Sequence, residues 1–369
     1  MNRSANDIVN NTMIEADSIQ INSLFPILFQ TNDPYVITLH KYIMPILAGF
    51  VFICNSLTIA VFWKIKLRNP THMLLLSICL CDMLGSFSFG VIDVYVFYFE
   101  DHRDYLPYRI CELYTFLYNF LPVFFHYSST YLTVGLAIER YICVVYPFRA
   151  KLICSKKHTL IFILFSVLCS GVYLTFQIYS HTYYANETSS FYLTNVTVQA
   201  CSIEVSNFTL WYLHPILFIL LPLVILICIE PAILKTLKRS NSLRTASSLS
   251  VHKSSRNLSV ITIWVVSIFI VCEVPILFYV SATFVCLELG LCSFLLTSSW
   301  MIYTHYTVTI TAVGQLFNFI IYITCNRRFR RAFGKTLTGR RYLLQRRFTA
   351  ESFFRETQLL RSSRSTSLR

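Results

Sequence analysis

The sequence predicts an all-α membrane protein, a seven-transmembrane helix bundle with a short amphipathic eighth helix. Its composition is the first observation behind this prediction. Of the 369 residues, 55% are hydrophobic and only 13% are charged, whereas about 25% of the residues in a typical soluble domain are charged. The chain therefore has too few charges to cover a soluble fold of this size. It is also too apolar to be a disordered chain.

Long stretches without charge are the second observation. Seven windows contain either no Asp, Glu, Lys or Arg or a single acid: 42–63, 73–92, 113–138, 158–180, 211–229, 257–286 and 293–325. A helix needs about 20 apolar residues to cross the hydrocarbon of a bilayer. Because backbone polar groups in lipid must pair within the segment, each window is predicted to be a transmembrane helix.

The distribution of the basic residues is the third observation, and it sets the orientation. The net charge is +13, yet 27 of the 31 Lys and Arg residues fall on one side of the predicted membrane. Basic loops and tails stay in the cytosol. We therefore expect a multi-pass protein of the plasma membrane with an extracellular N-terminus. Because the basic residues mark the inner membrane face, they do not indicate nucleic-acid binding. No nucleic-acid partner is expected.

In chain order, the prediction has four parts. Residues 1–39 form an extracellular, glycosylated N-terminus in which no apolar run of a cleavable signal peptide is visible. Residues 40–325 form the seven-helix bundle, 326–336 an amphipathic helix on the membrane surface, and 337–369 a disordered cytosolic tail. Five of the six sequons for N-glycosylation fall on predicted outer segments: Asn2, Asn10, Asn186, Asn195 and Asn207.

The segment after the seventh window combines aromatic and basic residues. Phe329 and Phe333 lie four residues apart and so share one face of a helix, with arginines on the other faces. This pattern is typical of a helix that lies on an anionic inner leaflet, and a flexible basic tail is the alternative. The Ser and Thr residues further on lie among arginines and are expected to be phosphorylated.

Asp82 is the single acid of its window and is predicted to lie near mid-membrane. A carboxylate at this depth is costly and indicates a functional site. Its predicted polar partners, at similar depths on other helices, are Asn55, Ser129 and Asn318. These oxygens suit a sodium ion or a water network, and a purely structural polar cluster is the alternative. The sequence predicts no other cofactor.

Glu139, Arg140 and Tyr141 directly follow the third window and end the predicted third helix on its inner side. An acid beside an arginine is able to hold it in an ion pair until a partner competes for the arginine. The three-residue motif is common by chance, but its place after a long uncharged helix makes it specific. We expect it to couple the bundle to a cytosolic partner.

Most of the 13 cysteines lie within the predicted helices or at their cytosolic ends, where a packed, reduced thiol is expected. Four others lie on the outer side: Cys111, Cys201, Cys286 and Cys292. A Cys111–Cys201 bridge would pin the second outer loop over the bundle. Cys286 and Cys292 are close enough in sequence to close a small ring, and this pairing stays open.

Together, these features resemble a rhodopsin-like (class A) G-protein-coupled receptor over residues 40–335. The motifs that carry the resemblance are Cys54-Asn55-Ser56, Leu67-Arg68-Asn69-Pro70-Thr71, Asp82, Cys111 with Cys201, Glu139-Arg140-Tyr141, Cys272-x-x-Pro275 and Asn318-x-x-x-Tyr322. The resemblance implies a Cys111–Cys201 disulfide, a heterotrimeric G protein as partner, and recruitment of a receptor kinase and arrestin to the tail.

A narrower likeness concerns the third and sixth windows. The run LPVFFHYSSTYLT at 121–133 and Glu273-x-Pro275 look like invertebrate receptors for FMRFamide-type peptides, myosuppressins and sex peptide. Ligands in this group are short neuropeptides, many of them amidated and ending in Arg-Phe. Glu273 stands where the wider family usually has Trp, and Phe319 where Pro is usual, so the family's aromatic activation switch is not carried over.

The predicted outer face is acidic and would attract a cationic ligand. Its acids are Asp93, Glu100, Asp101, Asp104, Glu112, Glu204 and Glu288. The hypothesis is that the arginine of a short peptide meets Glu273, with Asp93, Glu112, His126 and His305 as further ligand contacts. The alternatives are a Glu273 that is protonated or bonded within the bundle, and histidines that are simply packed.

Other classes of protein fit less well. An enzyme is not expected, because the nine histidines show no metal-binding spacing and no Gly-rich phosphate loop occurs. A transporter would show repeated halves or broken helices, and neither is apparent. A chemosensory seven-helix receptor for a small molecule is the main alternative, since it shares both composition and topology.

Overall fold

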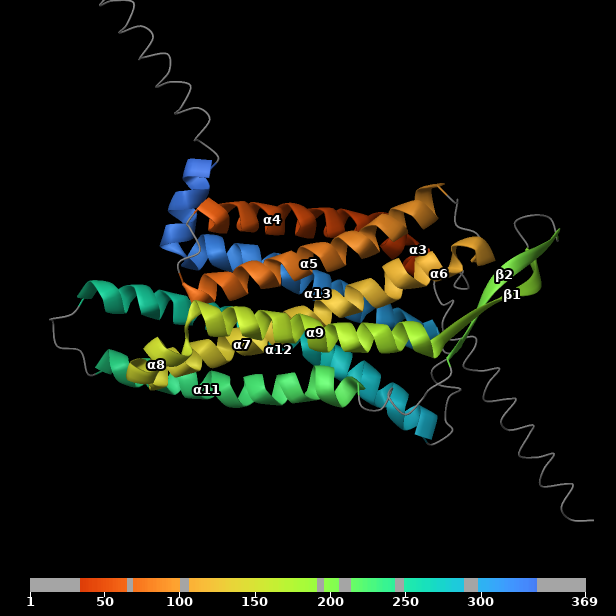
Figure 1. The fold of residues 1–369 in the computed structure, drawn as a ribbon. Coiled ribbons are helices and arrows are strands. Elements are labelled where there is room, and N and C mark those ends of the chain that lie inside the picture. Colours follow the sequence, from red (N-terminus) through yellow and green to blue (C-terminus); the bar gives the residue numbers. More distant parts are fainter. Residues whose placement is uncertain are drawn as a thin grey trace, which may run out of the picture.

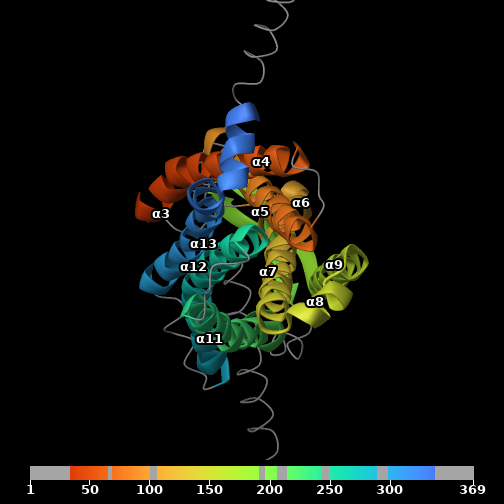
Figure 2. The ribbon, with the colours of Figure 1, turned by 90° about the vertical axis from the view of Figure 1, so that its left-hand side faces the viewer.

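Seven long helices lie side by side in a bundle, which confirms the predicted fold class (Figure 1). The computed structural model describes residues 34–64, 69–99, 106–190, 196–205, 214–242, 249–288 and 298–336. Figure 2 turns the bundle by 90° and shows its helices gathered around α7 and α12.

Each bundle helix is built from one or more elements. The first helix comprises α3 (Pro34–Thr38), η1 (Leu39–Ile43) and α4 (Met44–Lys64), and the second comprises α5 (Pro70–Val94) and η2 (Tyr95–Phe99). The third comprises η3 (Tyr108–Ile110), α6 (Cys111–Thr115), η4 (Phe116–Phe120) and α7 (Leu121–Val145). The remaining elements are α8 (Pro147–Ile153), α9 (Lys156–Ser180), η5 (Ile216–Leu220), α11 (Leu221–Ser242), α12 (Leu249–Glu288) and α13 (Ser298–Cys325).

Within the described ranges, six helices are long and apolar enough to cross a membrane, and α7 is not among them. The reason lies in its polar residues, which the bundle buries: Ser128, Ser129, Thr130 and Thr133. The helix packs against α5, α9, α11 and α12, so its polar faces contact protein instead of lipid. A central helix therefore has a weaker hydropathy signal than the helices around it.

The predicted amphipathic helix begins directly after α13. Asn326 interrupts α13, and its side-chain Oδ1 accepts hydrogen bonds from the backbone N–H groups of Arg328 and Phe329, each at 3.1 Å. Residues 327–336 are helical. Phe329 is completely buried, with its ring 5.5 Å from that of Phe62 and 5.8 Å from that of Tyr322, so the helix is anchored to the bundle by its apolar face.

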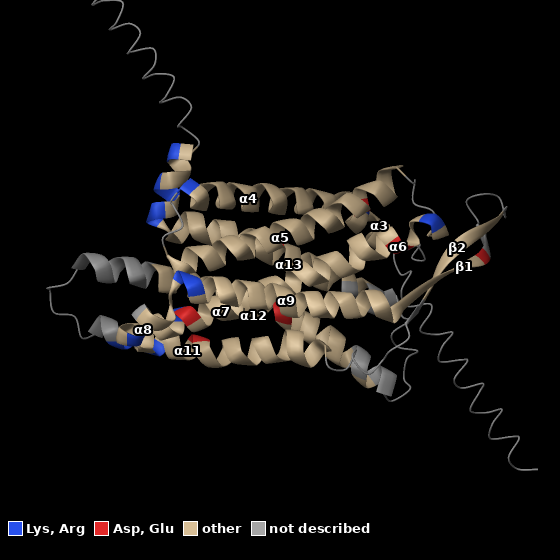
Figure 3. Cartoon of the chain, viewed as in Figure 1, with Lys and Arg blue, Asp and Glu red and all other residues tan. Residues whose placement is uncertain are grey.

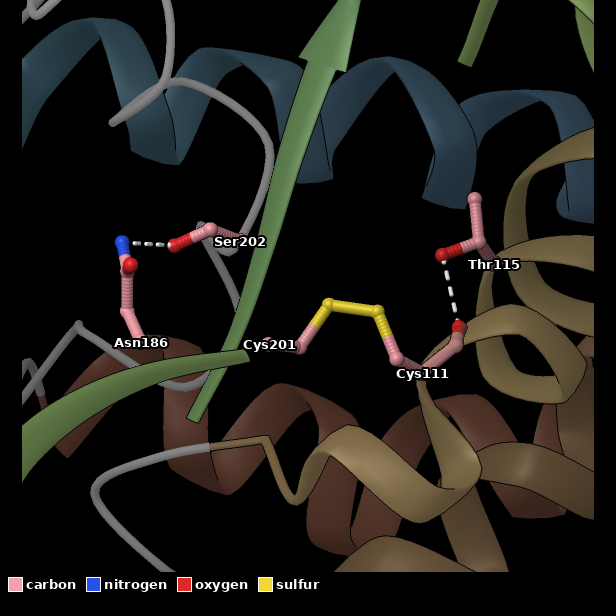
Figure 4. The surroundings of a disulfide bond; sticks show 5 residues. All are labelled: Cys111, Thr115, Asn186, Cys201 and Ser202. Carbon is pink, nitrogen blue, oxygen red and sulfur yellow. Dashed lines mark hydrogen bonds between the residues drawn. A yellow bond between two sulfur atoms is a disulfide. The ribbon is translucent and has the colours of Figure 1, made fainter. Parts of the chain in front are cut away.

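A β-hairpin that the sequence reasoning did not predict covers one end of the bundle. Strands β1 (His181–Ser190) and β2 (Val196–Val205) pair antiparallel, with Ala185 opposite Cys201. The Cys111–Cys201 disulfide joins β2 to the start of α6 with a Cα–Cα distance of 5.7 Å (Figure 4). The disulfide predicted from the family resemblance is thus confirmed.

The charges separate along the bundle. Figure 3 shows Lys and Arg gathered mainly at the end opposite the hairpin, on the helix after α13 and around α8 and α11. The helical walls between the two ends carry almost no charge. This arrangement agrees with a multi-pass membrane protein and with the predicted sidedness of its basic residues.

Candidate functional site

A buried ion pair lies at the basic end of α7. The Arg140 Nη2 atom donates to Glu139 Oε1 at 2.9 Å, and the Thr71 hydroxyl of α5 donates to the same oxygen at 2.8 Å. The residues of the pair are only 7% (Glu139) and 5% (Arg140) exposed. Tyr141 is partly buried and packs edge-on against Tyr146. Thr71, which sequence reasoning missed, therefore helps Glu139 to hold the arginine.

Asp82 lies at the centre of a second polar cluster. Its Oδ1 accepts a hydrogen bond from Ser129 at 2.8 Å, and its Oδ2 accepts one from Asn318 Nδ2 at 3.0 Å. Asn55, the third predicted partner, does not join them. Its amide donates to the Val51 carbonyl of its own helix at 3.1 Å, because this rotamer turns the side chain along α4. Only two of the three predicted partners contact the acid.

Glu273 of α12 faces His126 of α7. The Nε2 atom of His126 lies 3.1 Å from Glu273 Oε1, and the side chains are 20% (His126) and 3% (Glu273) exposed. Among the described residues, neither carboxylate oxygen of Glu273 has a hydrogen bond. The two groups thus lie close together without an aligned hydrogen bond, and both oxygens of Glu273 remain available to accept stronger donors.

Asp82 and Glu273 open onto the same internal cavity. Its volume is about 40 Å³, and polar groups of α5, α7, α12 and α13 line it: Asp82, His126, Ser129, Glu273, Gln315 and Asn318. A cavity of this size holds a few water molecules. The two acids predicted as separate features thus form one polar centre. In the described ranges, no group of three or more His, Cys, Asp or Glu side chains is arranged to hold a metal ion.

A third cluster joins the first, second and seventh helices near the hairpin end. Asp93 Oδ1 lies 3.2 Å from His40 Nδ1, and His40 Nε2 lies 2.8 Å from His305 Nδ1. These three residues are at most 5% exposed. Asp93 was predicted as an acid of the outer face and His305 as a further ligand contact, but both are buried against His40. Sequence reasoning missed His40 because it stands just outside a charge-free window.

The remaining predicted ligand residue, Glu112, is exposed in the first turn of α6. Partial burial raises the pKa of the neighbouring Tyr183 phenol of β1, and the Glu112 charge adds to this rise. Of the five predicted ligand residues, one therefore lies at the surface beside the hairpin. The other four form two separate buried groups.

An aromatic cluster lies between α7, α9 and the start of the fifth helix. The Tyr127 hydroxyl contacts His214 Nε2, and the His214 ring stacks on Tyr173 with centroids 5.0 Å apart. Phe218 stacks on Tyr127 at 4.8 Å. These rings form a largely apolar wall that also carries hydroxyl and imidazole groups.

Seven helices, a buried Glu–Arg pair at the basic end and a disulfide-anchored hairpin at the other define a membrane receptor that links two faces of a bilayer. A family model bears this out. The model of the 7 transmembrane receptor (rhodopsin family) matches residues 54–325, and the chain belongs to this family of G-protein-coupled receptors. The predicted family is thereby confirmed.

Individual relatives show which receptors this chain is similar to. The chain is 25% identical over 334 residues to the sex peptide receptor of Drosophila melanogaster, covering 83% of this chain and 74% of the relative. It is 23% identical over 284 residues to the sex peptide receptor-related protein 2 of Caenorhabditis elegans, covering 69% and 61%. It is also 23% identical over 295 residues to the lysophosphatidic acid receptor 4 of Homo sapiens, covering 74% and 66%.

Proposed function

We propose that this receptor binds a short cationic peptide of the amidated, Arg-Phe type outside the cell and transmits binding to a heterotrimeric G protein. Glu273 carries the proposal. It is a buried acid whose carboxylate has no hydrogen bond among the described residues and is opposed only by the edge of a histidine ring. A guanidinium group would give this carboxylate two parallel hydrogen bonds, which imidazole does not offer.

Ligand binding at Glu273 would act on the contact between α7 and α12. His126 and Glu273 link these two helices, so a guanidinium that replaces His126 releases one helix from the other. A ligand shifts a conformational equilibrium only through its different affinities for the two states. Here the affinities differ because Glu273 exchanges His126, with which it makes no aligned hydrogen bond, for a guanidinium group that aligns with it. Movement of α12 would then free Arg140 from Glu139 for a G-protein contact.

The comparisons also support a second ligand class. The likeness to lysophosphatidic acid receptors favours a lysophospholipid, whose phosphate needs cationic partners. The acidic and basic side chains around the cavity are those of Asp82, Glu273 and His126. Two acids and one histidine suit a cation better than a phosphate. A chemosensory receptor for a small molecule remains the alternative outside these two classes.

Further parts of the proposal concern the two membrane faces. We infer glycosylation at Asn186, which is exposed on β1; the other predicted sites, Asn2, Asn10, Asn195 and Asn207, lie outside the described residues. The tail after residue 336 also lies outside them, and we propose it as the target of a receptor kinase and arrestin. A sodium ion beside Asp82 is a further proposal, based on the oxygens around it.

The proposal is tested in cells that express the full-length receptor and report G-protein activation. A panel of amidated peptides ending in Arg-Phe is compared with the same peptides carrying citrulline, an uncharged analogue of arginine, and with lysophosphatidic acid. Glu273→Gln should lower the potency of the arginine peptides at least tenfold and leave the citrulline peptides unchanged. Glu187→Gln, which changes an exposed acid of β1 outside the predicted ligand contacts, is the matched control. Equal potency at the wild type and Glu273→Gln would refute the ligand contact.

A further inference from the structure

The cluster of His40, Asp93 and His305 is separate from the cavity at Glu273. It joins η1, α5 and α13 near the hairpin end, and its members are 0% (His40), 1% (Asp93) and 5% (His305) exposed. None of them lines the cavity of Asp82 and Glu273. The proposed peptide function therefore leaves these three titratable groups unexplained.

The contacts of the cluster form a chain in which every step needs one hydrogen. His40 Nδ1 lies 3.2 and 3.4 Å from the two oxygens of Asp93, and His40 Nε2 lies 2.8 Å from His305 Nδ1. Both ring nitrogens of His40 are thus engaged. The chain ends at His305 Nε2, a buried atom with no hydrogen-bond partner among the described residues.

Two protons are enough to make both contacts, and they leave a net charge of minus one. In that state Asp93 is ionised and accepts from His40 Nδ1, while His40 Nε2 accepts from His305 Nδ1. A third proton removes the net charge. It is held as an imidazolium on His40 or on His305 or, after a further shift of protons along the chain, as the carboxylic acid of Asp93; in each of these forms His305 Nε2 carries a hydrogen. Because an uncompensated buried charge is costly, the three-proton state is favoured.

The described groups around the cluster do not supply an alternative counter-charge. Tyr118 lies beside His40 with ring centroids 6.5 Å apart and stacks on Tyr114, and phenols ordinarily titrate near pH 10. Lys41 of η1 is partly exposed, and Glu112 of α6 and Tyr306 of α13 are exposed. The next acid of α5, Asp82, is buried in the separate cluster with Ser129 and Asn318. In the described ranges, Asp93 pairs with no lysine or arginine. Its charge is therefore balanced within the cluster.

We propose that His40, Asp93 and His305 form a proton-binding site that holds one extra proton at neutral pH and makes the packing of the first, second and seventh helices sensitive to extracellular pH. Loss of this proton leaves a buried net charge and weakens the contact among the three helices. The site needs no ligand, so its test is independent of the peptide proposal.

The sign of the pH dependence follows from proton counting. In the unfolded chain the aspartate is ionised above about pH 5, and each histidine titrates near 6.5. Above pH 6.5 the folded cluster therefore holds more protons than the unfolded chain, and stability falls as pH rises until the proton is released. Below pH 6.5 the unfolded chain holds more, and stability rises with pH. In Asp93→Asn the extra proton has no charge to balance, so the falling limb disappears.

The test uses the full-length receptor in lipid nanodiscs and follows unfolding from pH 5.5 to 8.5. Relative to Asp93→Asn, the wild-type unfolding constant should increase about tenfold per pH unit above pH 6.5. His158→Asn, which removes an exposed histidine, is the matched control and should follow the wild type. Parallel profiles for the wild type and Asp93→Asn would overturn the proposal.

A second measurement needs no substitution, in case Asp93→Asn does not fold. In the receptor labelled with ¹⁵N-histidine, the His40–His305 pair is identified by coupling between two ring nitrogens that share a hydrogen bond. The proposal requires the Nε2 atom of His305 to carry a hydrogen at pH 7.5. An unprotonated Nε2 at that pH would show the two-proton state and refute the proposal.

Discussion

Two groups among the described residues pair a buried acid with histidine, and they differ in how completely the acid is satisfied. Near the hairpin, Asp93 has both oxygens within 3.4 Å of His40, which in turn contacts His305. Deeper in the bundle, Glu273 has one misaligned histidine at 3.1 Å and a cavity beside it. A carboxylate and imidazole thus make a closed chain of contacts at Asp93 and an open contact at Glu273.

This difference suggests different roles. A closed chain of hydrogen bonds responds to its own proton content, because nothing else can reach it. An open contact has unused acceptor capacity and a cavity, so a better donor is able to replace the histidine. The two proposals therefore place proton binding at the outer group and ligand exchange at the inner pair.

The largest effect is expected when His126 is removed from its contact with Glu273. His126→Leu leaves Glu273 buried with no cationic partner, and losing one member of a buried pair costs about 3–5 kcal/mol of unfolding free energy. The double variant His126→Leu/Glu273→Leu should recover most of this loss. Unfolding of the purified receptor in nanodiscs at pH 7.5 measures both. An unchanged stability of His126→Leu would mean that Glu273 is already uncharged and that the contact is not an ion pair.

A smaller effect is expected when the outer chain is cut at its centre. His40→Leu separates Asp93 from His305, but Asp93 is able to keep the third proton and stay neutral. The cost is then that of unsatisfied buried polar groups, about 1–3 kcal/mol. The measurement is the same unfolding experiment. A loss larger than that of His126→Leu would reverse the proposed order of the two groups.

A third acid extends the comparison because one of its two carboxylate oxygens is hydrogen-bonded, which places it between Asp93 and Glu273. Glu139 receives hydrogen bonds from Arg140 and Thr71 on one oxygen, and its other oxygen has no partner among the described residues. Thr71→Val removes one bond, worth about 1 kcal/mol, and weakens the hold on Arg140. Ligand-free G-protein signalling, corrected for surface expression, should rise about fivefold. Unchanged basal signalling would show that Thr71 does not restrain the pair.

The sequence was sufficient to predict the seven helices because a bilayer permits few ways of satisfying backbone groups. It also located Ser129 and Asn318 near Asp82, since depth in the membrane follows from position along each window. Depth along a window gives neither the rotation of a helix about its axis nor the rotamer of a side chain. This is why Asn55 was wrongly predicted to contact Asp82. His40 was missed for a related reason, because only the packing of three helices brings it to Asp93.

The hairpin illustrates another limit. Strand β1 is mostly polar, and the apolar–polar alternation of β2 changes phase between Ala200 and Cys201. The two strands pair locally, with Ser190 opposite Val196, but neither has a strong strand signal of its own. Cys201 is fixed by the disulfide and by its backbone N–H, which donates to the Leu106 carbonyl at 2.8 Å. Contacts of this kind form only after the bundle has brought α6 beside the loop.

The smallest effect tests the corrected position of Asn55. Its Oδ1 atom is buried without a hydrogen bond among the described residues, and its amide bonds only within its own helix. Asn55→Leu keeps the number and branching of the side-chain heavy atoms and removes the unsatisfied oxygen, so the unfolding free energy should change by no more than about 0.5 kcal/mol. Ser129→Ala is the matched comparison, because it deletes one of the two hydrogen bonds that Asp82 accepts and should cost about 1 kcal/mol. If Asn55→Leu cost more than Ser129→Ala, Asn55 would belong to the Asp82 cluster after all, and Asp82 would be as fully satisfied as Asp93.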